Sequence, residues 1–210
     1  TRSLRITHSG LHLRDPAFAE GVDRDFAQRA GAPADAPPMF APLRLRGLEL
    51  SNRIVVSPMC QYSADDGTPG DWHLVHIGSR AVGGAALVMC EMTDVEREGR
   101  ITRGCTGMYK PEHVGAWRRI TDYVHAHTDA AIGLQIAHAG RKGATDLLWR
   151  GGESRPLPDD EAWPLISASA IPWTPQSRTP QAMDRADMDR VRDAFVRAAS
   201  MADDAGFDLL

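Results

Sequence analysis

The sequence predicts an α/β fold, the N-terminal half of an eightfold β/α barrel, in a chain that we expect to be truncated at both ends. Short and almost continuously apolar runs begin at Ile54, Ala85 and Ala130, each is followed by polar residues, and helical patterns separate them. Continuous rather than alternating hydrophobicity indicates strands buried on both faces, as in parallel sheets. A complete barrel needs about 250 residues, so this chain accounts for about four of the eight strands.

The composition is that of an ordinary globular protein, with 42% hydrophobic and 25% charged residues and a formal net charge of −4. No run approaches the roughly 18 to 20 apolar residues of a membrane span, and the N-terminus lacks the features of a signal peptide. We therefore expect a cytoplasmic protein that binds neither nucleic acid nor membranes. Cys60, Cys90 and Cys105 lack C-x-x-C spacing, so we expect free thiols and no metal site.

The first predicted helix is defined by its two ends. Asp15 caps it, with Pro16 in the first helical position, and Gly31 ends it. Large apolar residues recur at every fourth position along it and form a single stripe, Phe18, Val22 and Phe26. Such a stripe has to pack against another surface.

Residues 31–38, GAPADAPP, are rich in proline and alanine, as in a semi-rigid linker. We interpret residues 1–38 as the tail of a preceding domain plus this linker, and residues 39–210 as the N-terminal half of the barrel. A plain N-terminal decoration on one domain remains the alternative.

The later elements follow the order that repeated strand–helix units require. Alternation around Gly47 predicts a hairpin before the Ile54 strand. Three helices are predicted at residues 71–83, 111–126 and 184–206, the first and third capped by Asp71 and Asp184. The apolar face of the third is expected to consist of Met188, Val191, Phe195 and Met201.

Two further segments bear on the site. The long loop from Gly140 to Met183 is rich in proline and tryptophan, and loops of this length are usually functional, so we expect it to overhang the site. The chain begins at Thr1 rather than Met and ends at Leu210, in an apolar run that starts a fourth strand at Phe207. An unpaired strand edge there is the reason to expect truncation.

Polar and sulfur-containing side chains follow each predicted strand, where ligands bind in β/α folds. An amide that donates and accepts suits a planar heterocycle with adjacent N–H and C=O groups, and a nearby sulfur can tune its electronics, which favours a flavin. Gln135 is the sharpest signal, because a glutamine within a buried strand needs partners. The three strand ends present Ser57, Pro58, Met59, Cys60 and Tyr62; Glu91, Met92 and Thr93; and Gln135, His138, Arg141 and Lys142.

Plainer interpretations stand beside these. Cys60 could be a small core residue, and for Cys90, in the middle of a strand, we prefer that interpretation. His73 and His76 lie three apart on a helix, but without a third ligand they indicate packing or hydrogen bonding rather than a metal. Met59 and Met92 could fill gaps in the core, and Arg141 and Lys142 could be solvated loop charges.

Four stretches together resemble the Old Yellow Enzyme family of FMN-dependent oxidoreductases, in particular its class with a cysteine beside the flavin. They are SPMCQYS at 57–63, WHLVHIGSRA at 72–81, LVMCEMTDVEREGRI at 87–101 and GLQIAHAGRK at 133–142. The resemblance covers residues 39–210. It implies an eightfold β/α barrel with FMN at the carboxyl ends of the strands, and hydride transfer from NADPH or NADH through FMN to an electron-poor C=C bond.

The resemblance also implies roles for individual residues. Cys60 would lie near the reactive edge of the flavin and adjust its potential, and Tyr62 would reach the substrate, which makes these two the catalytic candidates. Gln135 would bind the pyrimidine part of the ring, and Lys142 would lie near the substrate cleft. The remaining cofactor contacts would come from Ser57, Pro58 and Met59, along the ring, and Met92.

The chain departs from the family pattern at two points. Met92 stands where a small residue is common against the flavin, so the pocket would differ in shape. The family's substrate-binding histidine pair and proton-donating tyrosine would follow the strand that begins at Phe207, so we expect this chain to lack part of the active site.

The N-terminal SLRITHSGLHLRD resembles the junction in bifunctional aryl-CoA monooxygenase/reductases, which implies an aryl-CoA substrate as one candidate. Homo-oligomerisation is a further candidate property. The alternative function is a truncated, non-catalytic barrel remnant that acts as an interaction domain.

Overall fold

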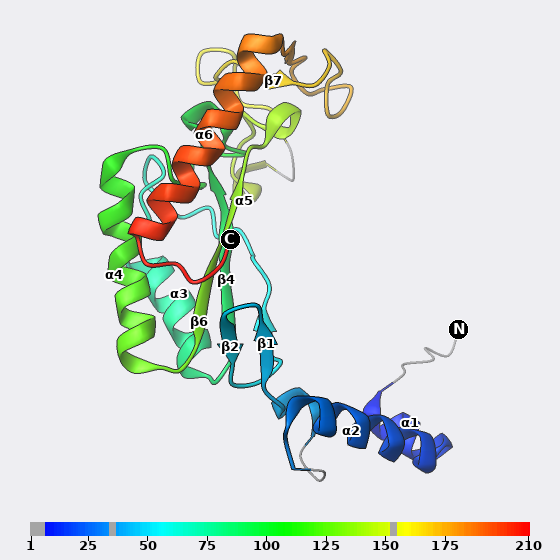
Figure 1. Ribbon diagram of the computed structural model, residues 1–210. Coiled ribbons are helices and arrows are strands. Elements are labelled where there is room, and N and C mark those ends of the chain that lie inside the picture. The colour runs from blue at the N-terminus through cyan, green and yellow to red at the C-terminus, as the bar shows by residue number, and fades with distance from the viewer. Residues whose placement is uncertain (1–6, 34–36, 152–154) are drawn as a thin grey trace. The chain divides into compact units, whose positions relative to one another are not determined.

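The computed structural model describes residues 7–33, 37–151 and 155–210 (Figure 1). The chain divides into two compact units, Thr1–Val55 and Val56–Leu210. Among the described residues, no helix is long and apolar enough to cross a membrane.

In the described residues of the first unit, two α-helices and a 3-10 helix precede a hairpin. The predicted helix is confirmed: the Asp15 carboxylate accepts a hydrogen bond from the Phe18 N–H at 3.0 Å, and Gly31 ends the helix with a left-handed φ of 64°. The helix before it was not predicted, and Thr7 caps that helix by accepting from the Gly10 N–H. The elements are α1 (His8–Arg14), α2 (Pro16–Ala30), η1 (Pro38–Phe40), β1 (Leu43–Leu45) and β2 (Leu48–Leu50).

The buried face of α2 differs from the predicted stripe. Ala19 and Ala27 are each only 2% exposed, whereas Phe18 is 56% exposed. Alanine lets a helix approach its neighbour closely, so small residues rather than aromatic ones form the contact face. The Arg53 guanidinium lies over the Phe26 ring, 5.5 Å from its centroid. Of the predicted linker, residues 34–36 lie outside the described residues.

The predicted hairpin is confirmed. Strands β1 and β2 pair antiparallel, with Leu43 opposite Leu50 and Leu45 opposite Leu48. The two-residue turn between them places Arg46 at a positive φ of 54°, as tight hairpin turns require.

The second unit follows a strand–helix order around a parallel sheet. The elements are β3 (Val55–Val56), which crosses the unit boundary, α3 (Asp71–Val82), β4 (Leu87–Asp94), η2 (Arg97–Gly99), β5 (Thr106–Gly107), α4 (Pro111–His127), β6 (Ala131–Ala137), η3 (Gly140–Lys142), α5 (Leu148–Gly151), β7 (Ile166–Ser167), β8 (Gln181–Ala182) and α6 (Arg185–Asp204).

The four-stranded sheet is centred on β4, which pairs with β3, β5 and β6. The predicted parallel pairing of β4 and β6 is confirmed from Leu87 opposite Ala131 onward. The strand predicted after Gly206 begins beside β6, since the Asp208 N–H donates to the Ile132 carbonyl at 2.9 Å. The Ile54 strand is shorter and more exposed than predicted, because β3 is an edge strand of two residues with β4 as its neighbour.

The helices pack on the sheet through both large and small apolar side chains. In Figure 1, α3 and α4 lie on the same side of β4 and β6, and α6 packs against α4 and β6. Trp117 of α4 is fully buried and meets Phe207 edge-on, 5.5 Å between ring centroids. The fully buried residues of α6 are Ala194, Ala198 and Ala202. Of the predicted row, Val191, Phe195 and Met201 are half-buried on the same face, and Met188 is exposed.

Two predicted caps have different outcomes. Asp184 caps α6 as predicted, accepting from the Asp187 N–H at 2.9 Å. Asp71 is the first residue of α3 and not its cap, which is Gly70. The Gly70 N–H donates instead to Nδ1 of His73, three residues on, which is the more specific interaction at this helix start.

Candidate active site

The first two predicted strand ends meet in the second unit. After β3 the chain runs beside β4, and the Met92 N–H donates to the Cys60 sulfur, which also hydrogen-bonds to the Tyr62 hydroxyl. The Gln61 N–H donates to Oε2 of Glu91 at 2.9 Å. Cys60, Tyr62 and Met92 are thus brought together, as the sequence predicted for neighbouring strand ends.

The third strand end joins them through the ladder between β4 and β6. Met92 lies directly opposite Gln135, after a bulge that leaves Glu91 without a partner in β6. Gln135 is exposed, so the premise that it lies buried is wrong: burial in β6 stops at Leu134. Its side-chain amide has no hydrogen-bond partner among the described residues, so both its donor and acceptor groups face outward.

Cys60 and Tyr62 are both uncharged at neutral pH. Burial raises the pKa of the Cys60 thiol, and the Glu91 charge raises it further. Burial raises the pKa of the Tyr62 phenol well above its ordinary range, with Cys60 and Cys105 adding to the effect. Both groups therefore keep their protons and can donate hydrogen bonds to a ligand.

The backbone of Tyr62 is strained and closely covered. Its φ of 50° lies in the left-handed region, which costs a non-glycine residue roughly 1–2 kcal/mol. Gly104, in the loop after β4, lies so close that a Cβ there would overlap the Tyr62 carbonyl oxygen. The Gly104 carbonyl accepts from the Ala64 N–H at 3.0 Å, so the two loops are in contact through backbone. Gly104 was not among the predicted site residues.

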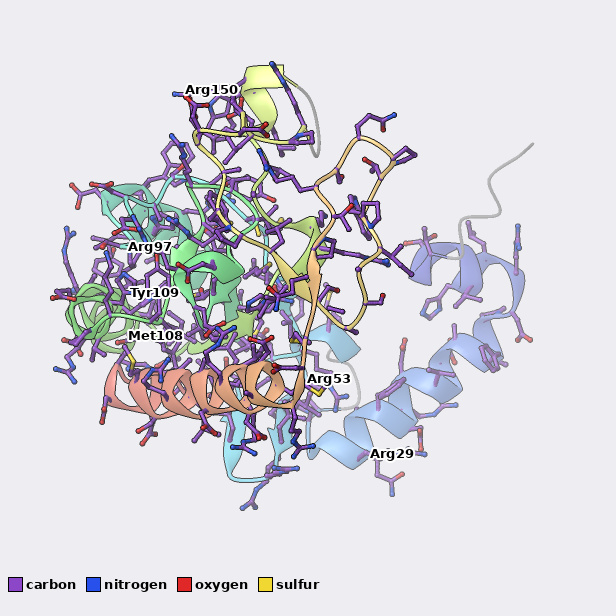
Figure 2. The ribbon with its side chains drawn as sticks, turned by 90° about the horizontal axis from the view of Figure 1, so that it is seen from above. Arg29, Arg53, Arg97, Met108, Tyr109 and Arg150 are labelled. Atoms are coloured by element: carbon purple, nitrogen blue, oxygen red, sulfur yellow. The ribbon has the colours of Figure 1, made fainter. Side chains whose placement is uncertain are left out.

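A cavity of about 680 Å³ opens beside Tyr62. The long loop contributes to its wall, which supports the expectation that this loop overhangs the site. Arg97 and Arg150, which belong to η2 and α5, are labelled in Figure 2. The cavity is lined by Tyr62, Ser63, Ala64, Asp65 and Asp66; Arg97, Glu98, Arg100, Arg103 and Gly104; and Leu147, Arg150, Glu161 and Trp163. The arginine spacing in REGRITRG was the available sequence signal for this wall.

Asp66 ties the first loop to the second across this cavity. It accepts from Arg97 at 2.9 Å and from Lys110, and lies 3.4 Å from Arg100. Burial alone would raise the pKa of Asp66, but hydrogen bonds from Lys110 and Arg97 outweigh it and lower the pKa to about 2. The carboxylate is therefore charged throughout the physiological range.

Lys142 is not among the residues that line the cavity. Its ammonium lies 5.6 Å from the centroid of the Trp173 ring, and the Arg141 guanidinium lies 5.7 Å from the same ring. Both cations are half-buried beside Trp173, which belongs to the same long loop, rather than fully solvated. At the other end of the site, Ser57 and Met59 are exposed and Pro58 is half-buried.

The plainer interpretations hold for Cys90 and His73. Cys90 is buried within β4, and burial raises the pKa of its thiol well above the ordinary value. His73 is fully buried and paired with Glu91. Among residues 7–33, 37–151 and 155–210, no three His, Cys, Asp or Glu side chains are grouped so that they could hold a metal ion.

Fold and site together define a partial β/α barrel with amide, thiol and phenol groups at the carboxyl ends of its parallel strands. Residues 38–210 match the NADH:flavin oxidoreductase / NADH oxidase family. The chain belongs to that family, which confirms the predicted family and fold.

Individual relatives and solved structures agree with this family assignment. An NADPH dehydrogenase of Geobacillus sp. is 40% identical over 174 residues, 82% of this chain and 46% of the relative. The structure of morphinone reductase in complex with tetrahydroNAD is 25% identical with a TM-score of 0.70, covering 83% of this chain and 48% of that one. Old Yellow Enzyme from Pichia sp. is also 25% identical, with a TM-score of 0.69 over 81% of this chain and 44% of that one. The chain thus spans about half the length of the relatives it matches.

Proposed function

We propose that residues 39–210 form part of an FMN-binding barrel in an NAD(P)H-dependent oxidoreductase that reduces electron-poor C=C bonds. The observation that carries this is the free amide of Gln135, opposite Met92, at the sheet edge where Cys60 and Tyr62 also lie. Its exposed donor and acceptor fit the adjacent N–H and C=O groups of a flavin pyrimidine edge. FMN, when bound, supplies the hydride-accepting and hydride-donating chemistry.

The chain's own residues would hold and tune that group. Gln135 would hydrogen-bond the pyrimidine edge, with Met92 beside it. Exposed Ser57 and Met59, with Pro58, would lie along the ring. The uncharged Cys60 thiol would lie near the flavin and adjust its potential.

Substrate would meet Tyr62, which lines the cavity and can donate a hydrogen bond from its phenol. Lys142 lies beside the Trp173 ring and does not line that cavity. Tyr62 is therefore the stronger of the two candidates. Both substrate-binding roles would apply to the chain with FMN bound.

An FMN titration tests the proposal. The purified chain is titrated into FMN and the quenching of flavin fluorescence is followed, with Gln135→Leu as the variant and Gln181→Leu, an exposed glutamine on β8, as the matched control. We expect saturable binding that Gln135→Leu weakens about tenfold and Gln181→Leu leaves unchanged. Equal affinity in all three proteins would refute the role of Gln135, and absence of binding would favour the non-catalytic interaction domain.

We further propose that residues 1–38 are the tail and linker of a preceding domain, and that the whole protein acts on an aryl-CoA thioester. The support is the resemblance of the N-terminal sequence to the junction of bifunctional monooxygenase/reductases. Comparing NADPH and NADH oxidation with an α,β-unsaturated aryl-CoA and with the matching free acid tests it. Faster turnover of the thioester is expected, and equal rates would contradict this assignment.

A further inference from the structure

Two ionisable side chains are buried together beneath the segment that carries Cys60 and Tyr62. His73 of α3 is 0% exposed and Glu91 of β4 is 4% exposed. Nε2 of His73 lies 3.2 Å from Oε1 of Glu91. Burying a carboxylate is costly unless other groups compensate for the lost water, so the partners of Glu91 indicate its role.

The histidine is oriented from its other ring nitrogen. Nδ1 of His73 accepts the Gly70 N–H at 3.1 Å, so a proton on the ring is carried by Nε2, which faces Glu91. Nε2 makes no well-aligned hydrogen bond, so its contact with the carboxylate is electrostatic. Helix α3 therefore directs the Nε2 edge of the His73 ring at one oxygen of Glu91.

The second oxygen of Glu91 reaches the candidate site. Oε2 accepts the Gln61 N–H at 2.9 Å, and Gln61 lies between Cys60 and Tyr62. The strand bulge accounts for this reach, because Cys90 pairs with Leu134 and Met92 with Gln135, and Glu91 is the extra residue. Bulges commonly re-aim a side chain in this way.

We propose that Glu91, paired with His73, is a positioning residue that fixes the Cys60–Tyr62 segment against β4. The functional importance of Glu91 rests on the proposed roles of Cys60 and Tyr62, whereas the contacts by which it holds the segment do not depend on those roles. Ser57 to Ser63 form no regular secondary structure, so the segment depends on such contacts for its position.

The ionisable groups around the Cys60 thiol allow the position of Glu91 to be tested by titrating that thiol. Cys60 faces Glu91 and Asp94 from β4, Tyr62 from its own segment and Cys105 from the following loop. Glu91 in turn faces His73 and, from the same helix, His76. Of these groups, Glu91 raises the pKa of the Cys60 thiol most, after burial itself.

The experiment combines thiol titration with amide exchange on the full chain without flavin. Cys60 is half-buried whereas Cys90 and Cys105 are buried, so alkylation by iodoacetamide across pH 7–11 followed by peptide mass analysis isolates Cys60. The variant is Glu91→Gln. The control is Glu96→Gln, since Glu96 is a half-buried glutamate that pairs with His138 at 3.4 Å and with Arg190 at 2.7 Å.

In Glu91→Gln we expect the Cys60 alkylation midpoint to move to lower pH, because a negative charge beside the thiolate is gone. The Gln61 amide should exchange about tenfold faster, because a hydrogen bond to a charged acceptor is replaced by one to a neutral acceptor. Glu96→Gln should change neither. A general loosening of the fold would also lower the midpoint, because burial is the largest cause of the raised Cys60 pKa, but it would speed exchange of the β4 and β6 amides as well as that of Gln61.

Unchanged Cys60 titration and Gln61 exchange in Glu91→Gln would overturn the proposal. If that variant does not fold, amide exchange in the unaltered chain tests the proposal. The Gln61 amide should then exchange more slowly than the amides of Tyr62 and Ser63, because those two N–H groups have no acceptor among the described residues. Equal exchange at the three amides would overturn it as well. Because neither readout uses FMN, failure here is distinct from failure of flavin binding.

Discussion

The two sides of the candidate site are built differently. The segment from Cys60 to Tyr62 is held by the chain itself, through Glu91, the Met92 N–H and the Gly104 backbone. Gln135, on β6, lies at the same sheet edge but leaves its amide without a protein partner in the described part of the chain. The Cys60–Tyr62 side, which we call the held side, is therefore fixed by the protein, whereas the Gln135 side offers free hydrogen-bonding groups.

This difference distinguishes residues that support the site from residues that would bind a ligand. A group whose hydrogen bonds are satisfied internally contributes shape and electrostatics, whereas an exposed amide gains only when something binds to it. Substitutions on the held side should therefore change stability, and substitutions of Gln135 should change affinity. The following predictions test that separation, beginning with the largest change in the free energy of unfolding.

Gly104→Ala should destabilise the chain most, by about 3 kcal/mol. The new Cβ would overlap the Tyr62 carbonyl oxygen, which is backbone and cannot rotate away. Urea unfolding measures the change. The control is Gly115→Ala in α4, where a Cβ meets nothing within 4 Å and the helix should gain about 1 kcal/mol. Equal stability of Gly104→Ala and the unaltered chain would show that the two loops are not in close contact.

Asp94→Asn tests an exception on the side of the site that the chain itself holds. Asp94 is a fully buried carboxyl at the end of β4, with the weakly donating Cys105 thiol beside it. Burial raises its pKa well above the ordinary 3.8, against the opposing charge of Arg100. The folded state thus binds the proton more tightly, so the stability that Asp94 contributes is present below pH 3.8 and is lost as pH rises toward the folded pKa, at most ~1.4 kcal/mol per pH unit.

Asp94→Asn should therefore remove this loss of stability with rising pH, and it should stabilise the chain at pH 7 by about 1–2 kcal/mol. Urea unfolding between pH 4 and 8 measures it, with the exposed Asp122→Asn in α4 as the control that keeps this loss. If the two variants give the same pH dependence, Asp94 is not the carboxyl responsible.

Asp66→Asn should have a smaller effect of opposite sign, a loss of about 0.5–1 kcal/mol at neutral pH, because the carboxylate is partly exposed and screened by solvent. Its pKa is lowered to about 2, so its contribution is present above the ordinary 3.8 and is lost as pH falls toward 2. Thermal unfolding between pH 2 and 7 measures this. The neighbouring Asp65→Asn, whose side chain has no ion pair among the described residues, should leave the curve unchanged.

The sequence predicted the parallel strands, the main helices and the grouping of Cys60, Tyr62, Met92 and Gln135, because hydrophobic continuity and strand ends are local signals. The alanines at the centre of the buried faces of α2 and α6, such as Ala19 and Ala194, were not predicted, because alanine carries little weight in a hydrophobic pattern although it packs most closely.

The contacts that support the site could not be predicted in the same way. Glu91 was recognised as part of a strand end, but its bond to the Gln61 N–H depends on a bulge that the pattern does not encode. Gly104 and Asp66 act across loops that are distant in sequence. Tertiary proximity of this kind becomes visible only in the folded chain.

Gln135→Leu is the sharpest test of the comparison, because it should change stability least. The side chain is exposed and makes no protein hydrogen bond among the described residues, so the free energy of unfolding should stay within about 0.5 kcal/mol. A loss above 1 kcal/mol in urea unfolding would mean that the amide supports the fold and that the two sides of the site do not differ. An unchanged free energy of unfolding, together with weaker flavin binding, would place Gln135 among the residues whose partner is a ligand and not the protein.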